Sequence, residues 1–300
     1  MNKFYRSILV ISGVLIAVSL PAAAFAKTKD QTNGILYKIS GKGLAKPSYL
    51  FGTVHVICTA DMFSSEKLGS LLDQTDRLVM EINLGEAGEM AQMAQGLTLP
   101  EGKTLKDILT PEQFAKVDAM LINTLGIGAD NALIGRMSPV ALQVMILSSP
   151  KELGCTSPSA YELVLTQLAN SKKKPIEGLE TAQFQKQAVD KIPLDAQAKM
   201  LYEMALDPDK SAAQFKELIA TYKLQDSEKL YETISSQIGA DKDMETQLVS
   251  SRNKTWVPKI DTMIKEKSSF IAVGGGHLGG KEGLVSALRG LGYKVDAIRL

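Results

Sequence analysis

The sequence predicts an α/β fold in which both ends of the chain contribute strands to one sheet and a large, mostly helical insertion separates them. Three observations predict it. Residues 35–84 carry β-rich apolar runs around one helix, residues 86–262 show helical periodicity, and residues 268–300 have the pattern strand, glycine-rich turn, helix, strand. No internal repeat or low-complexity tract interrupts this order.

The first 26 residues have the three parts of a bacterial secretory signal peptide. A short basic segment precedes the apolar run SILVISGVLIAVSL, and Ala24 and Ala26 are the small residues required before a cleavage site. We expect cleavage after Ala26, a mature domain of residues 27–300, and a periplasmic or secreted location. The alternative is an uncleaved membrane anchor, although the apolar run is short for a span. No other membrane contact is expected.

Composition narrows the possible functions. The chain has 34 lysines and arginines against 33 aspartates and glutamates, so nothing in its charge indicates a nucleic-acid-binding surface. The two cysteines, Cys58 and Cys155, predict one disulfide in an oxidising compartment, with two free thiols as the alternative. Neither lies in a Cys-x-x-Cys motif, so a redox function is not indicated. The sequence does not determine an oligomeric state.

Residues 35–84 predict a hairpin, a helix and a buried strand. The β-rich runs ILYKIS and SYLFGTVHV are separated by a Gly/Lys/Pro turn, which is typical of a hairpin. The helix SSEKLGSLLDQT begins with serine. The short apolar run DRLVMEINL then has the pattern of a buried strand.

Residues 86–262 predict a series of helices and a single strand. TPEQFAKVDAMLINTLG begins with Thr-Pro and ends near Gly126, and the helices SPVALQVMILS and SPSAYELVLTQLANS each open with Ser-Pro. The strand is KKPIEGL, at about 174–179. Amphipathic helices continue to about residue 262, with breaks expected near Pro193, Asp207-Pro208 and Gly239.

The segment FIAVGGGHLGG, residues 270–280, has the glycine spacing of a dinucleotide-binding turn. It also contains His277, one of only two histidines in the chain. A histidine crowds the place where a pyrophosphate would lie, and nicotinamide cofactors are scarce outside the cell. We therefore expect no NAD, and expect the glycines to let the strand turn sharply and bring His277 close to a ligand.

Four chemically active side chains follow predicted strands. His55 and His277 each end a Gly-x-x-His motif, and Glu81 and Glu180 end the apolar runs RLVM and KPIEGL. Ligands bind at the carboxyl ends of strands in α/β sheets, so we expect all four at one sheet edge. Two imidazoles and two carboxylates form either a metal site or an acid/base cluster, and as a metal site they suit Mn, Zn, Co or Fe.

Each of these residues also has a structural interpretation. His55 is also consistent with a hydrogen-bonded structural histidine, and His277 with a helix cap or a hydrogen bond to the backbone. Glu81 is also consistent with an ion pair to a lysine or arginine. Glu180 is consistent with the first turn of the next helix, where the helix dipole favours a carboxylate.

The chain resembles the TraB/GumN family, which includes the Tiki proteases. The segments that carry the resemblance are SYLFGTVHV, LVMEINL, GLETAQFQ, SRNKTWVPKI and FIAVGGGHLGGKEGLVSALRGLGYKV. The resemblance implies one metal-dependent hydrolytic site built from two Gly-x-x-His motifs and a glutamate, and for Tiki proteins a peptidase activity that depends on manganese or cobalt. The positions that match are His55, His277, Glu81, Glu180, Arg252 and Asn253.

We accordingly expect a metal-dependent hydrolase that acts on a peptide or a small-molecule substrate with Mn, Co or Zn. His55, His277 and Glu81 are the expected metal ligands. Imidazole binds metal in its neutral form, so binding should weaken as the pH falls below about 6.5.

The expected catalytic residues are Glu180, Glu81, Arg252 and Asn253. Glu180 is the expected general base, acting on metal-bound water, with Glu81 as the other candidate. Arg252 would stabilise an oxyanion or orient a substrate carboxylate, and the alternative is a structural ion pair with either glutamate.

Two other functions remain open. One is a non-catalytic protein that binds a metal or haem, as in the ChaN-like proteins of a related fold. The other is a regulatory protein that uses the helical region to bind a partner.

Overall fold

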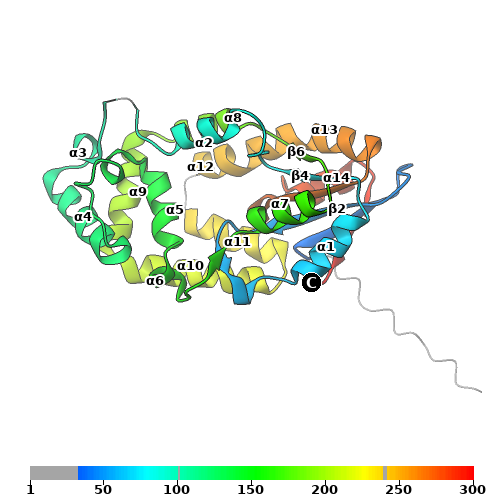
Figure 1. Ribbon diagram of the computed structural model, residues 1–300, viewed down its shortest axis with the longest axis horizontal. Coiled ribbons are helices and arrows are strands. Elements are labelled where there is room, and N and C mark those ends of the chain that lie inside the picture. The colour runs from blue at the N-terminus through cyan, green and yellow to red at the C-terminus, as the bar shows by residue number, and fades with distance from the viewer. Residues whose placement is uncertain (1–32, 101, 239–241) are drawn as a thin grey trace, which may run out of the picture. The chain divides into compact units, whose positions relative to one another are not determined.

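The structure, a computed structural model, describes residues 33–100, 102–238 and 242–300. Within them, strands from both ends of the chain form one sheet, and the middle of the chain is mostly helical (Figure 1). The predicted α/β fold is confirmed. The predicted signal peptide and its cleavage site lie outside the described residues.

The main sheet has six strands in the order β6-β4-β7-β2-β1-β8. β6, β4, β7 and β2 are parallel to one another, and β1 is antiparallel to both β2 and β8. Four neighbouring strands therefore end at the same edge. The bounds are β1 Leu36–Ser40, β2 Ser48–Thr53, β4 Arg77–Met80, β6 Ile176–Gly178, β7 Ser269–Gly274 and β8 Lys294–Ile298.

The two faces of the sheet bury alternating side chains. In β7, Phe270 and Ala272 belong to one apolar core, and Ile271 and Val273 belong to the other, as the period of two in a strand requires. Helices cover both faces, which is usual for parallel strands. The first face packs against α1 Ser65–Asp73 and α7 Tyr161–Ser171, and the second against α13 Ser251–Glu266 and α14 Leu284–Gly290.

The predicted elements of the N-terminal part form as expected. β1 and β2 make the hairpin, joined through a turn in which Gly41, Lys42 and Gly43 all have positive φ. Ser64 caps α1 by accepting a hydrogen bond from the N–H of Lys67. The buried strand after this helix is β4.

Part of the helical middle has its own apolar core, formed by α3, α4, α5 and α9. Thr110 opens α4 with a capping box and Gly126 ends it in the left-handed conformation, as its sequence predicts. The middle of the chain also supplies β6, α7 and α13 to the sheet layers. Its other bounds are α2 Glu89–Gly96, α3 Leu105–Ile108, α4 Pro111–Leu125, α5 Pro139–Leu147, α6 Pro150–Leu153, α8 Ala182–Asp190, α9 Leu194–Leu206, α10 Pro208–Lys223, α11 Ser227–Ile238 and α12 Lys242–Glu245.

One predicted helix start is wrong. Ser157-Pro158 was expected to open a helix, but Pro158–Ser159 form the short strand β5, and α7 begins at Tyr161. β5 pairs with β3, Ile57–Cys58. This tertiary pairing outweighs the preference of proline for the first turn of a helix.

One break between helices lacks the glycine or proline that usually marks such a position in the sequence. α10 and α11 are separated at Gln225, which adopts a positive φ of 55°. Asp226 then starts α11 by accepting hydrogen bonds from the N–H groups of Glu228 and Lys229. The expected break near Gly239 lies outside the described residues.

Cys58 and Cys155 form the predicted disulfide, which closes a separation of 97 residues. Because Cys58 follows His55 closely, the bond ties the segment that carries this histidine to the helical middle. In the part of the chain that the structure describes, no helix is both long and apolar enough to span a membrane.

Candidate active site

The parallel strands bring the predicted residues to one edge of the sheet. His55 follows β2, Glu81 follows β4, Glu180 follows β6 and His277 follows β7. These four strands are neighbours in the order β6-β4-β7-β2. Their carboxyl ends therefore lie side by side, which is the usual place for a ligand in such a sheet.

The glycine-rich turn after β7 packs tightly against its surroundings. A Cβ added to Gly275 would lie 2.6 Å from Leu230 of α11, and one added to Gly279 would lie 2.3 Å from the carbonyl oxygen of Ser227. Gly52, the glycine of the first histidine motif, faces the same turn, and a Cβ there would lie 3.0 Å from the Cα of Gly275. The glycines thus hold the two histidine-bearing turns against each other and against α11.

Asn253 fixes the ring of His277. Its amide nitrogen donates to the carbonyl oxygens of His277 (3.2 Å) and Glu282 (2.9 Å), so its amide oxygen faces the ring atom Nδ1, 2.8 Å away. Since that oxygen only accepts, Nδ1 carries the proton and Nε2 keeps its lone pair. Burial lowers the pKa of His277 to about 3, against the opposing charge of Glu81. The ring is therefore neutral at physiological pH.

Arg252 connects both glutamates with this histidine. Its Nη2 atom lies 2.5 Å from Glu81 Oε2 and 2.7 Å from Glu180 Oε1, and its Nη1 lies 3.2 Å from His277 Nε2. The ion pair that was the structural alternative for Arg252 therefore forms, and it includes both glutamates. Arg252 comes just after the π-helical turn Thr246–Ser250, a widened turn that is frequent at functional sites.

Glu81 is the glutamate beside the histidine. Its Oε1 accepts the N–H of Gly274 at 2.6 Å and lies 3.9 Å from His277 Nε2. Burial alone would raise the pKa of Glu81, but the positive charge of Arg252, together with smaller contributions, lowers it to about 2. Glu81 is therefore a carboxylate over the whole physiological range.

Glu180 lies on the other side of Arg252, with its side chain 2% exposed. Burial raises its pKa. Its oxygens nevertheless accept hydrogen bonds from Arg252 and from the indole N–H of Trp256, at 2.9 Å, and these donors favour the carboxylate. With His277 neutral, the two carboxylates exceed the single guanidinium by one negative charge.

His55 occupies a different environment. Its side chain is 69% exposed, and its Nδ1 lies 3.5 Å from Glu162 Oε1. The Glu162 carboxylate raises the pKa of His55 to about 9. Glu162 Oε1 also accepts a hydrogen bond from Thr53, at 2.9 Å. The other oxygen of Glu162 is buried and has no hydrogen-bond partner, so this carboxylate has capacity for a further cation or donor.

Glu162 and Trp256 are contacts of the site that the sequence analysis missed. Glu162 lies in the first turn of α7, where glutamates are common because of the helix dipole, so its position gives no signal. Trp256 lies four residues after Arg252 on the buried face of α13. Residues four apart lie on the same face of a helix, so the position of the chain's only tryptophan could have indicated its contact with the site.

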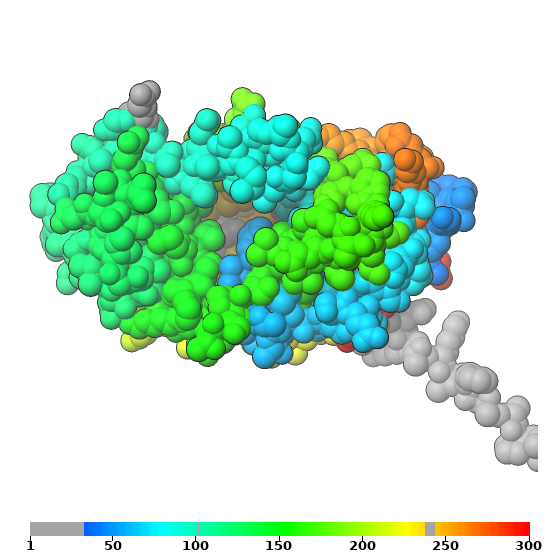
Figure 2. Space-filling model, viewed as in Figure 1, coloured from blue at the N-terminus to red at the C-terminus, as the bar shows by residue number. Residues whose placement is uncertain are grey.

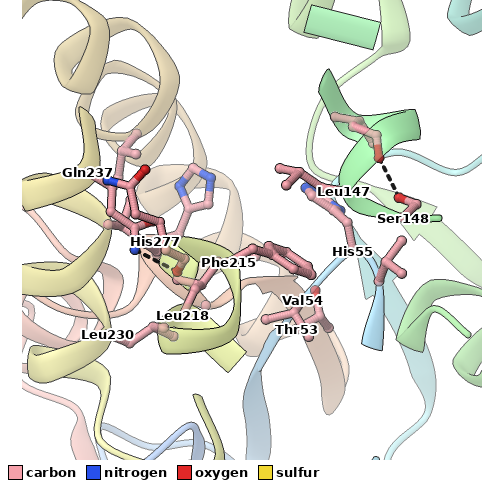
Figure 3. A pocket seen from close by; sticks show the side chains of 18 of the residues that line it. Thr53, Val54, His55, Leu147, Ser148, Phe215, Leu218, Leu230, Gln237 and His277 are labelled. Atoms are coloured by element: carbon pink, nitrogen blue, oxygen red, sulfur yellow. Dashed lines mark hydrogen bonds between the residues drawn. The ribbon is translucent and has the colours of Figure 1, made fainter. Parts of the chain in front are cut away.

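A cavity of about 400 Å³ opens at this edge of the sheet. Its lining includes His55, Glu81, Arg252 and His277 together with side chains from helices of the middle of the chain. His277 lies on one side of it and His55 on the other, beside Leu147 and Ser148 (Figure 3). The surface is visibly hollowed between α5 and α7 (Figure 2). Glu180 lines a separate cavity of about 260 Å³ together with Phe184. The two glutamates therefore line different cavities, although both accept a hydrogen bond from Arg252.

The donor chemistry fits a divalent metal, although the ligand set is incomplete. His277 Nε2 and Glu81 Oε1 are 3.9 Å apart, and two ligands at about 2.1 Å each can share one ion at that separation. The excess negative charge favours a cation. Among the described residues, however, no three His, Cys, Asp or Glu side chains converge on one point. His55 supplies a third donor only if its exposed ring turns toward the other two.

Comparison with known proteins places the chain in a family. The model of the TraB/PrgY/gumN family matches residues 35–297. The metalloprotease TIKI2 of Xenopus tropicalis is 23% identical over 94% of this chain and 63% of its own length, and TIKI1 of Danio rerio is 22% identical over 83% and 60%. The chain thus spans less than two thirds of these relatives. No solved structure matches it. Because the family model covers most of the sequence, the chain belongs to the TraB/PrgY/gumN family.

Proposed function

We propose that this protein is an exported metal-dependent hydrolase that cleaves peptide bonds. The observation that carries the proposal is the placement of His277 Nε2 and Glu81 Oε1, 3.9 Å apart, beside a cavity that His55 also lines. Distant relatives named metalloproteases support this reaction class. The signal-peptide pattern that ends at Ala26 supports export.

His277, Glu81 and His55 would hold the metal. An ion such as Mn, Co or Zn, when bound, polarises a carbonyl group and activates water. Asn253 keeps Nε2 of His277 unprotonated by accepting from Nδ1. Glu162 lies 3.5 Å from Nδ1 of His55, and a carboxylate beside a ligand's second nitrogen is usual in metal sites. Because Glu162 raises the pKa of His55 to about 9, His55 would release a proton when it binds the ion.

Arg252 would bind the substrate carbonyl oxygen as negative charge develops on it. The N–H for this contact would be the one on Nη1 that faces His277 Nε2, because binding of the ion at Nε2 would release it, whereas the other N–H groups donate to Glu81, Glu180 and Leu248. The Arg252 guanidinium lines the cavity and is held from the other side by Glu180 and by the ring of Trp256, 4.6 Å away. Glu180 as the general base remains a prediction. Its placement supports a different role, which is to position Arg252.

A cleavage assay tests the proposed function. Purified, metal-stripped protein is incubated with a quenched fluorescent peptide library and with Mn, Co, Zn or chelator. We expect metal-dependent cleavage that falls by more than roughly 100-fold in His277→Ala and Glu81→Gln, because even groups that support a ligand contribute about 10- to 100-fold. The control Lys254→Ala removes an exposed charge from the same helix as Arg252. Folded protein that cleaves no peptide with any of these metals, or that cleaves equally well with chelator, contradicts the proposal.

A further inference from the structure

The cavity beside the candidate active site has one charged wall, and most of its remaining lining is apolar. The charged wall consists of Glu81 and Arg252 beside His277, and His55 lies across the cavity next to Leu147. The apolar part comes from α5, α9, α10 and α11, and its larger side chains are Leu147, Met204, Phe215, Leu218, Leu230 and Ile234. Binding sites for organic ligands combine an apolar lining of this kind with a few placed polar groups.

Two of these side chains lie outside the apolar cores of the protein. Among the described residues, Leu147 and Phe215 belong to none of the three apolar cores and are not packed against them. Both are only partly buried. Figure 3 shows the ring of Phe215 between the His277 side of the cavity and the side that holds Leu147 and His55. Apolar side chains that face a cavity and not a core are available to a ligand.

We propose that this half of the cavity binds a bulky apolar side chain of a peptide, of the size of leucine, methionine or phenylalanine, next to the bond that is cleaved. The inference rests on the proposed function and adds the substrate class. The cavity volume of about 400 Å³ lies within the range of roughly 300 to 1,000 Å³ typical of ligand sites.

The backbone favours a peptide over a simple acyl chain as the occupant. Gly274, Gly275 and Gly276 line the cavity together with Thr53 at the end of β2. Because the glycines have no side chains, their main-chain groups lie at the cavity wall, although the N–H of Gly274 already donates to Glu81 and the carbonyl of Gly275 already accepts from Leu278. Main-chain hydrogen-bonding groups beside apolar pockets are the usual means of recognising an extended peptide.

A peptide series tests the preference. The peptides share one sequence and differ only in the residue next to the cleaved bond, which is Gly, Ala, Leu, Phe or Glu. We expect kcat/KM for the Leu and Phe peptides to exceed that for the Gly peptide by roughly 10- to 150-fold, as burial of a large apolar side chain allows. Equal rates, or a preference for Glu, overturn the inference and leave the hydrolase proposal intact.

Variants of the apolar wall locate the preference. Phe215→Ala and Leu147→Ala should each reduce the ratio of Phe to Gly cleavage rates by roughly threefold to tenfold, because each removes part of the apolar contact. Leu133→Ala is the matched control, since Leu133 is 80% exposed in the helical middle. A ratio that stays the same in both cavity variants overturns the assignment to this wall.

Binding to the inactive Glu81→Gln variant separates this inference from the proposed function. The ring of Trp256, the only tryptophan, lies 4.5 Å from that of His277, so its fluorescence reports on the charged wall. Leu and Phe peptides should bind at least roughly tenfold more tightly than the Gly peptide. If the wild type cleaves none of the peptides but this binding preference is seen, the hydrolase proposal fails and the inference about the apolar side chain stands. Binding of dodecanoate, with no preference among the peptides, overturns it.

Discussion

The two Gly-x-x-His turns share a sequence pattern and a position at a strand end, but their surroundings differ. The side chain of His277 is 6% exposed and that of His55 is 69% exposed. An amide oxygen lies 2.8 Å from His277 Nδ1, whereas a carboxylate oxygen lies 3.5 Å from His55 Nδ1. The motif therefore specifies where the ring is placed, and its partner specifies the protonation state.

The supports of the two turns also come from different parts of the molecule. His277 is held by α13, which packs in the core on one face of the sheet. His55 is held by α7 and by a segment that the Cys58–Cys155 disulfide ties to the helical middle. Changes in one support should therefore affect one histidine and not the other.

The largest effect is expected from Arg252→Met on the His277 side. The substitution leaves Glu81 and Glu180 buried without their shared cation, and breaking a buried ion pair costs about 3 to 5 kcal/mol. Lys254→Met, which removes an exposed cation from the same helix, should cost under about 1 kcal/mol. Urea denaturation measures both. Similar losses in the two variants would show that the buried cluster does not stabilise the fold.

The next effect concerns the His55 side. Replacing both Cys58 and Cys155 by alanine should lower the free energy of unfolding by about 2 to 4 kcal/mol, because the unfolded chain loses a long cross-link. Selective ¹⁵N-histidine labelling gives signals from only two rings. The His55 signals should change and the His277 signals should stay. Equal changes in both rings are the contrary outcome.

A smaller loss is expected from Asn253→Ala. The variant leaves two backbone carbonyl groups and His277 Nδ1 without their partner, which should cost about 1 to 3 kcal/mol. In the same NMR experiment, His277 should lose its preference for the Nδ1-protonated form. Asn170→Ala, at an exposed position, is the control. An unchanged tautomer would mean that Asn253 does not set it.

The smallest effect on stability is expected from Glu162→Gln, under about 1 kcal/mol, because the ion pair with His55 is partly exposed. The effect of this substitution on the pKa of His55 is larger. His55 should carry a proton up to about pH 9 in the wild type and titrate nearer to pH 6.5 in the variant. His277 should remain neutral down to about pH 3 in both proteins. Two rings that titrate together in the wild type are incompatible with these environments.

These shifts affect stability in opposite directions. The folded-state pKa of His55 is raised, so its contribution is complete below about pH 6.5 and disappears as the pH rises through about 9. The folded-state pKa of His277 is lowered. The unfolded chain therefore binds an extra proton between about pH 6.5 and 3, and stability falls as the pH falls through that range.

Much of the fold could be predicted because its signals are local. The apolar runs that form β2, β4 and β7 identify the strands, and the rule for carboxyl ends of parallel strands places His55, Glu81 and His277 at one edge. The capping residues of α4 fix its bounds for the same reason. These signals depend only on residues that are close together in the sequence.

The environments at the site could not be predicted, because they depend on contacts between distant segments. Glu162 and His55 are far apart in the sequence, and nothing near either residue indicates their pairing. Glu81 and Glu180 line different cavities because of the position of the Arg252 side chain. Arg252 follows a π-helical turn that has no sequence signal. The break at Gln225 likewise depends on the packing of α10 and α11.

Metal titration tests the central claim most directly. Metal-stripped wild type, His277→Ala, His55→Ala and the control Lys254→Ala are titrated with Mn, Co and Zn by calorimetry. If both strand-end histidines serve one ion, the wild type and the control bind it with equal affinity, and each histidine variant binds it at least roughly tenfold more weakly. Folded wild type that binds none of these metals, or binding that survives the loss of His277, would contradict a metal site at this edge of the sheet.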